Sequence, residues 1–442
     1  MKILSNFSGL KAYFIGIGGI SMSGLARLLI SSGCSVCGSD SGMDNPEIGK
    51  LRLDGVKVFS RHDPLNIDQD IDFVVYTLAV KDDNPELIRA RELKIPCFER
   101  AEMLGLIARA YSNVIAVSGT HGKTTTTALI GEIFTLAGLD PTIHIGGVSV
   151  NLNSCTIIGN KDFLILEACE YGNSFRFIAS DTAVITNIES DHLDYYKDLE
   201  DIVNSFRHFS SRSHHLISDI SVNIEHKSIC VIGKDWQVKE IDYSQNGYDF
   251  MVEYKGKFWG KARLNIIGKY NVYNALFAIA VADKYGIPKE TILSAISRFS
   301  GVERRCEKIA SIGDIPIIID YAHHPTEISS VLHSLDAMYS NILVVFQPHT
   351  YTRTMSLFDE FIGALQDRKN LIIYSTYPAR EKEIIGGRAE DLVSAIGCAE
   401  YEYDFTRLVS RIDKADKCGF DLVLVLGAGN LAEMLKVYYK KV

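Results

Sequence analysis

The 442-residue chain has no apolar run that approaches the roughly 18 residues of a membrane-spanning helix. Its first residues, MKILSNFSGLKAYFIGIGG, lack the uninterrupted apolar core and the small-residue cleavage site of a signal peptide. It also lacks a block of basic residues, and its formal net charge is -9. That balance argues against nucleic acid or an anionic membrane as a partner, but leaves phosphorylated small molecules open. We therefore expect a cytosolic protein.

The sequence also lacks a regular set of cysteines. The nine cysteines are scattered and odd in number, which suits a reducing compartment. Cys34 and Cys37 form one C-x-x-C, but no second pair completes a zinc site. We interpret both as core cysteines. No solenoid repeat and no low-complexity tract is present.

Apolar runs alternate with helical patterns along most of the chain, which predicts parallel sheets built from βαβ units. A chain of this length is too long for one core. The pattern predicts an α/β protein of three domains with boundaries near 108 and 300: residues 1–108, 109–300 and 301–442. We expect Rossmann-like first and third domains around a central phosphate-loop domain with a mostly parallel sheet. Alternating residues over about 221–265 predict inserted antiparallel strands.

The stretch GTHGKTTTT, at 119–127, predicts a phosphate-binding loop. It follows the apolar strand 114–117 and opens a helix, so backbone N–H groups and the helix N-terminus can hold an anion. Lys123 would reach the β- and γ-phosphates of a nucleotide, and Thr124 would ligate magnesium. Gly119 and Gly122 would allow the backbone to approach closely. The loop is shorter than G-x-x-x-x-G-K-[ST], because Val117 stands where the first glycine of that form belongs.

Carboxylates that follow neighbouring strands are candidates for the remaining magnesium ligands. Glu167 comes directly after the apolar strand 163–166. The strand 182–188 runs into a cluster of polar residues, Glu189, Asp191, His192 and Asp194. Any one of these four is more often a solvated loop residue, but their clustering in a nucleotide domain favours function.

An earlier glycine-rich turn, GIGGIS at 16–21, resembles a dinucleotide fingerprint after the strand 13–15. Gly16 and Gly18 fit the pattern, and Asp40 stands where an acid that binds ribose is expected. Ser21 replaces the third glycine, which weakens an NAD interpretation. The turn suits a diphosphate at a helix N-terminus, which NAD, FAD or a UDP-sugar would each provide.

In the predicted third domain, residues 301–442, polar side chains follow two strands, at the edge where open α/β sheets bind ligands. His323 and His324 follow the strand 315–319, whereas His349 and Arg353 follow the strand 342–346. A helix-start pair without a ligand is the alternative for the two adjacent histidines. Convergence from separate strands is hard to explain by packing alone.

With these features, the chain resembles the Mur ligase family along its whole length. Several motifs carry the resemblance: GIGGISMSGLA, VKDDNPEL, GTHGKTTTT, EACEYGNSF, TNIESDHLDYY, GKYNVYNA, GVERRCE, DYAHHPTEI, FQPHTYTRT and GAGN. The short form of the phosphate loop is usual in this family. The resemblance implies an ATP- and Mg²⁺-dependent ligase that joins L-alanine to the lactyl carboxylate of UDP-N-acetylmuramate through an acyl phosphate, for peptidoglycan synthesis. A monomer or a homodimer is expected.

The resemblance also implies roles at matching positions. ATP would contact Gly119, Thr120, His121, Gly122, Lys123, Thr124, Thr125, Asn271, Asn274, Arg305 and Asp320. Magnesium would be held by Thr124, Glu167 and His192. The UDP-sugar would contact Gly16, Gly18, Gly19, Ser21 and Asp40. Tyr321, His323, His349 and Arg353 would line the carboxylate and amino-acid pocket.

Some positions depart from the family pattern, and other functions stay open. Tyr270 replaces a frequent histidine, Cys306 a frequent aromatic residue, and Cys169 a common aspartate. The nearest alternative is a ligase that attaches a recycled murein tripeptide to UDP-N-acetylmuramate. An NAD-dependent oxidoreductase and a non-catalytic ATP-binding regulator are alternatives from other classes. Sequence alone does not choose between His323 and His349 as the group that takes the amine proton.

Overall fold

The structure is a computed structural model that describes residues 7–42, 45–192, 195–244, 247–379 and 381–440. Its residues group into two compact units. The first unit comprises Met1–Tyr243, Asp249–Leu264 and Tyr273–Phe299. The second comprises Ser244–Tyr248, Asn265–Val272 and Ser300–Val442. The predicted α/β class is confirmed, whereas the boundaries near 108 and 300 stay predictions.

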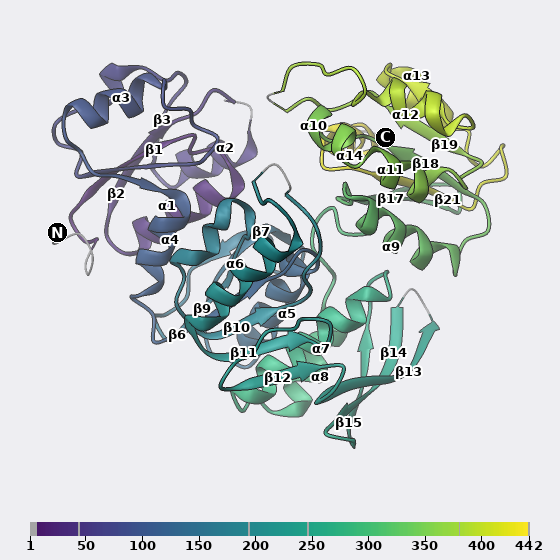
Figure 1. Ribbon diagram of the computed structural model, residues 1–442, viewed down its shortest axis with the longest axis horizontal. Helices are drawn as coiled ribbons and strands as arrows, with labels where there is room; N and C mark the ends of the chain where they lie inside the picture. The colour runs from purple at the N-terminus through teal and green to yellow at the C-terminus, as the bar shows by residue number, and fades with distance from the viewer. Residues whose placement is uncertain (1–6, 43–44, 193–194, 245–246, 380, 441–442) are drawn as a thin grey trace. The chain divides into compact units, whose positions relative to one another are not determined.

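The first sheet of unit 1 is wholly parallel, with the order β3-β2-β1-β4-β5. Figure 1 labels its strands β1, β2 and β3. Strand order reverses at β1, and ligands of open α/β sheets bind at such a switch point. The elements are β1 Lys11–Ile15, α1 Ile20–Ser31, β2 Ser35–Ser39, α2 Pro46–Leu53, β3 Lys57–Phe59, η1 Pro64–Asn66, β4 Phe73–Tyr76, α3 Pro85–Glu92, β5 Cys97–Glu99 and α4 Arg100–Ala108.

The second sheet has ten strands in the order β15-β14-β13-β12-β11-β10-β6-β9-β7-β8. Its centre is parallel, because β6 pairs with β9 and β10, and β10 with β11. The elements are β6 Asn113–Ser118, α5 Lys123–Leu136, β7 Thr142–Ser149, β8 Ser154–Ile157, β9 Phe163–Glu167, η2 Tyr171–Phe177, β10 Ser180–Ile185, α6 Leu199–Ser211, β11 Ser213–Asp219, β12 Ile229–Ile232, β13 Trp236–Ser244, β14 Gly247–Tyr254, β15 Lys257–Leu264, α7 Tyr270–Lys284 and α8 Lys289–Arg298.

The expectation of antiparallel strands over 221–265 is wrong for β12, which pairs parallel with both of its neighbours, β11 and β13. This strand pairs parallel with β11, with Ile217 opposite Cys230. The loop of residues 220–228 between β11 and β12 carries the chain back to the start of β11, so that β12 runs in the same direction as β11. β13, β14 and β15 then extend the same sheet as consecutive neighbours.

The third sheet lies in unit 2, with the order β16-β17-β21-β18-β19-β20. It is parallel except for the edge strand β16, which pairs antiparallel with β17. The elements are β16 Glu307–Ile312, β17 Ile315–Asp320, α9 Pro325–Asp336, β18 Ile342–Phe346, α10 Tyr351–Ser356, α11 Phe358–Leu365, β19 Leu371–Tyr374, α12 Ala389–Ile396, β20 Glu400–Glu402, α13 Phe405–Ile412, β21 Leu422–Leu426 and α14 Leu431–Tyr439.

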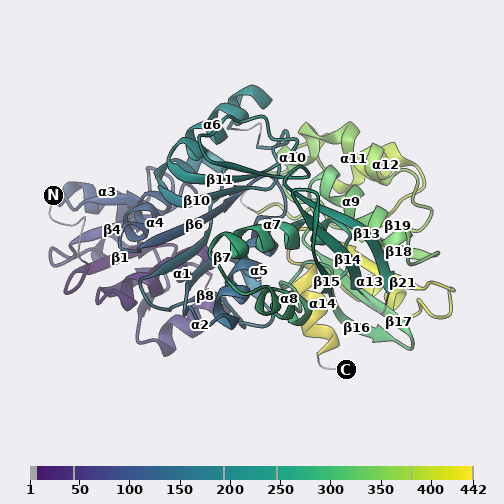
Figure 2. The same ribbon diagram turned by 90° about the horizontal axis from the view of Figure 1, so that it is seen from below.

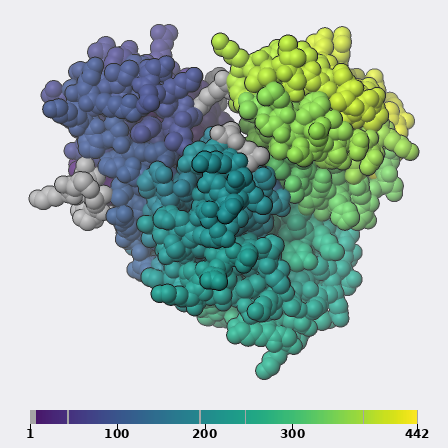
Figure 3. All heavy atoms as spheres, viewed as in Figure 1, coloured from purple at the N-terminus to yellow at the C-terminus, as the bar shows by residue number. Residues whose placement is uncertain are grey.

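The strands that position the candidate sites are buried on both faces, as parallel sheets between helices require. The central residues of β6, β9 and β21 have almost no exposed surface. Figure 2 shows α5 and α8 on one side of the second sheet. Figure 3, which draws every heavy atom as a sphere, shows the closely packed outer atoms of each unit. Within the described ranges, no helix combines the length and the apolar character that a membrane span requires.

Candidate functional site

The GTHGKTTTT loop connects β6 to α5 and depends on two glycines. Gly122 is the N-cap of α5 with a left-handed φ of 83°, and Gly119 has a φ of 138°. A Cβ at Gly119 would lie 2.0 Å from the Thr186 hydroxyl, and one at Gly122 would lie 2.5 Å from Asn274 Oδ1. Glycine is therefore required at both positions by backbone conformation and by space.

Lys123, the first residue of α5, directs its ammonium into the loop. Nζ donates to the carbonyl oxygens of Gly119 at 2.5 Å and Thr120 at 2.9 Å, and to Glu170 Oε1 at 2.9 Å. Burial alone would lower the pKa of Lys123, but the carboxylates of Glu170 and Glu167 outweigh it and the pKa is raised. Burial would likewise raise the pKa of Glu170, yet Lys123 and His192 hold it below its ordinary value. The two groups form a buried ion pair.

The loop is held by the segment after β10. Asn187 Oδ1 accepts from the His121 N–H at 2.8 Å, and the Thr186 hydroxyl donates to the His121 carbonyl at 2.5 Å. The Thr120 hydroxyl accepts from the Glu189 N–H at 2.9 Å. Of the predicted polar cluster, Glu189 thus helps to fix the shape of the phosphate loop.

The predicted magnesium ligands come from three places. Thr124 is buried in the first turn of α5, and Glu167 ends β9, directly beside Val117 of β6. Glu167 Oε2 accepts from the Gly146 N–H at 2.8 Å. His192 Nε2 lies 3.6 Å from both Glu170 Oε1 and Asp191 Oδ2. Asp194 lies outside the described residues.

Among the described residues, no group of three or more histidine, cysteine or acidic side chains is arranged to hold a metal ion. A metal site at this edge would need oxygens from a nucleotide as well as from the protein. The structure adds one residue that the sequence interpretation missed, Glu170. Its position three residues after Glu167 was a usable signal, because Glu167 ends β9 and Glu170 follows at the same edge of the sheet.

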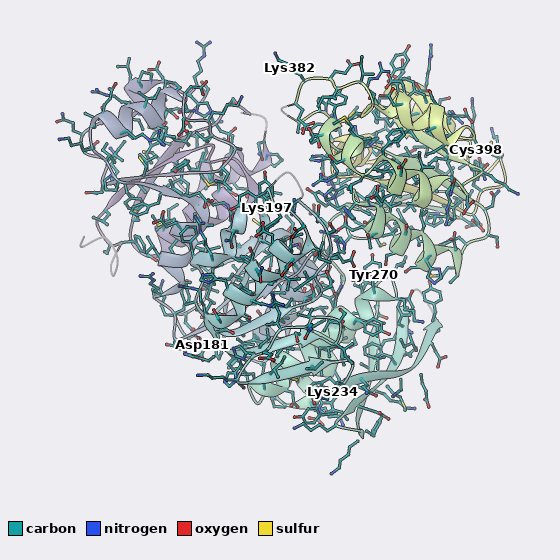
Figure 4. The ribbon with its side chains drawn as sticks, in the orientation of Figure 1. Asp181, Lys197, Lys234, Tyr270, Lys382 and Cys398 are labelled. Atoms are coloured by element: carbon teal, nitrogen blue, oxygen red, sulfur yellow. The ribbon has the colours of Figure 1, made fainter. Side chains whose placement is uncertain are left out.

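Asn271 and Asn274 lie one helical turn apart near the start of α7. Both are buried, and Asn271 Nδ2 donates to the Ile267 carbonyl at 2.7 Å. Tyr270, the first residue of α7 (Figure 4), lies with its hydroxyl 3.5 Å from Cys306 Sγ. The two departures from the family pattern, at 270 and 306, are therefore in contact with each other.

The first glycine-rich turn is closed by Asp40. Its carboxylate accepts from the Gly18 N–H and the Gly42 N–H, each at 2.8 Å. A Cβ at Gly18 would lie 2.9 Å from Asp40 Oδ2, and Gly16 has a φ of 79°. Gly19 is the N-cap of α1. The predicted ribose-binding acid thus supports the turn itself.

Ser21 joins this turn to the second sheet. Its hydroxyl accepts from Arg100 Nη1 at 3.1 Å and lies 3.3 Å from His144 Nε2 on β7. Burial, followed by the charge of Arg100, lowers the pKa of His144 to about 4. The residue that replaced the third glycine therefore connects the two sheets of unit 1.

In unit 2, Asp320 ends β17 and is buried. Its carboxylate accepts from the Cys306 N–H and the Ala322 N–H, each at 2.7 Å, although burial raises its pKa. Arg304 and Arg305 lie over the ring of Tyr321, at 4.8 and 5.2 Å from its centroid. Both arginines are thus in contact with the same aromatic ring.

Tyr321 and two further predicted residues, His323 and His349, form a continuous group of rings. Tyr321 contacts His323 edge-on, with ring centroids 5.2 Å apart, and His323 contacts His349 at 5.8 Å. Arg353 Nη1 donates to His349 Nδ1 at 3.2 Å. Tyr377, which sequence reasoning missed, stacks on His349 at 5.7 Å. The structure thus brings together side chains that follow β17, β18 and β19.

The neighbouring His324 has a different task. It is the N-cap of α9, and its Nδ1 accepts from the Thr326 N–H. The interpretation of a helix-start residue holds for His324, whereas His323 faces the ring group.

Three stretches of the chain match known protein families. Residues 11–112 match the Mur ligase family, catalytic domain; residues 117–282 match the Mur ligase middle domain; and residues 304–429 match the Mur ligase, glutamate ligase domain. The matched stretches follow the three sheets in order.

Full-length relatives agree with these matches. The chain is 39% identical to the UDP-N-acetylmuramate–L-alanine ligase of Caldicellulosiruptor bescii, over 98% of each chain. The solved structure of the UDP-N-acetylmuramate–alanine ligase of Thermotoga maritima is similar with a TM-score of 0.82 and 28% identity, over 98% of this chain and 99% of that one. A murein peptide ligase from Psychrobacter arcticus shares the fold, with a TM-score of 0.73, 23% identity and 98% coverage of both chains.

Proposed function

The chain belongs to the Mur ligase family, and from that premise we propose that it joins the amine of L-alanine to the lactyl carboxyl of UDP-N-acetylmuramate. The reaction consumes ATP and supplies a precursor of peptidoglycan. The observation that carries this proposal is end-to-end similarity to L-alanine ligases, at 39% identity, in a chain whose phosphate loop retains Lys123 at the start of α5.

Each domain has its own task in this proposal. The domain of residues 1–108 binds the UDP part of the substrate at the turn formed by Gly16, Gly18, Gly19 and Ser21, with Asp40 supporting that turn. The domain of residues 109–300 binds ATP, and the domain of residues 301–442 provides the residues for the amino acid. Support comes from the switch point beside β1 and from the loop at the N-terminus of α5.

In the ATP site, backbone N–H groups and Lys123 bind the phosphates. Asn271 and Asn274 recognise adenine, and Arg305 and Asp320 contact the nucleotide. The loop residues Thr120, His121 and Thr125 complete the site. The arrangement at α5 supports this assignment, because a helix N-terminus and an ammonium both favour a polyphosphate.

The residues present fit a magnesium ion. Thr124 and Glu167 offer the oxygen atoms that this cation prefers. His192, in the segment after β10, lies 3.6 Å from Glu170 Oε1. The buried Oε2 of Glu170 has no hydrogen-bond partner among the described residues. Thr124, Glu167 and His192 would hold the ion. When bound, magnesium would neutralise negative charge on the phosphoryl group in transfer.

The chemistry proceeds in two steps. A carboxylate oxygen of UDP-N-acetylmuramate attacks the γ-phosphorus of ATP, which forms an acyl phosphate and releases ADP. The L-alanine nitrogen then attacks the acyl carbon, a C–N bond forms, and the C–O bond to phosphate breaks. The nitrogen loses its proton during this second step. The protein supplies position and charge rather than a covalent nucleophile.

His323 is the better acceptor for that proton. Its Nδ1–H donates to the Tyr321 carbonyl at 2.9 Å, so Nε2 carries the lone pair. His349 has the opposite arrangement, because its Nδ1 accepts from Arg353 and its Nε2 therefore carries the proton in the neutral ring. Arg353 and His349 bind and orient the amino acid beside Tyr321.

The test is phosphate release from ATP in the presence of UDP-N-acetylmuramate, with and without L-alanine. We expect release that depends on L-alanine. If murein tripeptide supported release and L-alanine did not, the chain would be a recycling ligase instead. A change in NAD absorbance without ATP turnover would support an oxidoreductase, against which the complete phosphate loop argues.

A further inference from the structure

Glu170 occupies an unusual electrostatic position in unit 1. Only 4% of its surface is exposed, and its Oε1 lies 2.9 Å from Lys123 Nζ and 3.6 Å from His192 Nε2. Its Oε2 is buried without a hydrogen-bond partner among the described residues. A buried carboxylate oxygen in that state is costly unless a cation or a donor reaches it.

Lys123 neutralises the charge of Glu170, but its ammonium is then not available to bind a phosphate. An ammonium has three N–H donors, and Gly119, Thr120 and Glu170 accept all three. The ammonium of Lys123 therefore has no N–H left to donate to a phosphate in this arrangement. Nucleotide binding must break at least one of these bonds.

Once Lys123 turns toward a phosphate, Glu170 loses its nearest cation while a polyanion arrives beside it. Breaking a buried pair in this way is strongly unfavourable when nothing replaces the lost partner, because an uncompensated charge stays buried. A hard divalent cation would supply the charge and would use the unpartnered Oε2, because such ions prefer carboxylate oxygens.

The side chain of Glu170 is not needed to hold its own backbone. The Tyr196 hydroxyl donates to the Glu170 carbonyl at 2.5 Å, and the Asn173 N–H donates to the same oxygen at 2.9 Å. These bonds remain when the carboxylate is changed. A role in the ion site thus explains the buried charge better than a role in folding.

We propose that Glu170 is a cation-exchange residue of the nucleotide site: it binds the ammonium of Lys123 when the loop is free of nucleotide, and it faces magnesium when ATP is bound. Glu170 thereby couples the affinity for ATP to the presence of magnesium. The inference rests on the proposed ATP site at this loop.

The experiment measures ATP affinity by calorimetry for the full chain, once with EDTA and once with excess magnesium. The ratio of the two dissociation constants is the metal coupling. For Glu170→Gln we expect tighter binding than wild type in EDTA, because Lys123 is released. We also expect the coupling to fall on the order of tenfold, within the usual range for linked sites.

Glu132→Gln is the matched control. Glu132 is another buried glutamate, on α5, whose carboxylate accepts from the Ser149 hydroxyl at 2.9 Å. It should keep the wild-type coupling. Glu170→Asp, which keeps the charge but shortens the reach toward Lys123, should also bind ATP more tightly in EDTA, and serves if the glutamine variant does not fold.

An unchanged coupling in both Glu170 variants would overturn the inference. So would binding that weakens by the same factor with and without magnesium, because that pattern indicates a merely structural residue. If wild type bound no ATP under either condition, the proposed ATP site itself would be wrong.

Discussion

The ring centroids of His323 and His349 lie 5.8 Å apart, yet the two histidines present different nitrogen atoms as hydrogen-bond acceptors. Nδ1 of His323 donates to the Tyr321 carbonyl, whereas Nδ1 of His349 accepts from Arg353. A neutral His323 therefore has its lone pair at Nε2, and a neutral His349 has its proton there. Two histidines that lie side by side thus differ in which ring nitrogen can accept a proton.

The first prediction concerns proton transfer. His323→Ala should lower kcat by about 10²-fold, within the usual range for a general base. His349→Ala should mainly raise the KM for L-alanine, because we propose that His349 binds the amino acid rather than accepting its proton. Steady-state kinetics of both variants at saturating ATP measures this split. Equal kcat losses in the two variants would contradict the assignment.

A second prediction concerns the charge of the same two rings. Burial first, and then the nearby cation Arg353, lowers the pKa of His323 to about 4; burial, His323 and Arg353 lower that of His349 to about 4. Both rings should therefore be neutral at pH 7 and gain a proton only as the pH falls through about 4. An NMR titration of the ligand-free protein measures each value. A pKa near the ordinary histidine value would show that the two rings are more exposed to water than they are in the structure.

A third prediction concerns the phosphate loop. Lys123→Ala should reduce ATP-dependent ligation by at least about 10²-fold, because it removes the cation that stabilises the transferred phosphoryl group. Binding of UDP-N-acetylmuramate, measured by calorimetry, should stay close to wild type. Near-normal turnover by this variant would show that the loop is not the ATP site.

A fourth prediction separates backbone strain from steric conflict. Gly138→Ala should cost about 1–2 kcal/mol of unfolding free energy, because its φ is 75° but nothing lies within 4 Å of the new Cβ. Gly122→Ala should cost more and weaken ATP binding, because its Cβ would also meet Asn274. Denaturant unfolding of both variants makes the comparison. Equal costs would mean that the contact with Asn274 relaxes freely.

A fifth prediction concerns the metal. Glu167→Gln and His192→Ala should each raise the magnesium concentration needed for half-maximal activity, or suppress kcat, because each would remove a ligand. A magnesium titration of both variants, with the Glu132→Gln variant as control, measures the effect. Two titrations that match wild type would remove both residues from the ligand set.

The sequence by itself determined the α/β class, the order of the glycine-rich turns and the family. These three properties follow from local patterns. Buried strands appear in the sequence as apolar runs, and the short loop with Lys123 and Thr124 is continuous in the chain. The strand predicted over 342–346 has the observed bounds of β18, whereas the short strands β5 and β20 were missed because three residues give too little periodicity.

Only the tertiary structure decided which polar groups meet. Glu170 and Lys123 are 47 residues apart in the chain, and their contact exists because β9 and β6 are neighbours in the sheet. The acceptor nitrogen of each histidine was likewise set by partners from the fold. A hydrogen bond depends on distance and direction to an atom elsewhere in the chain, and residue type and spacing do not contain that information.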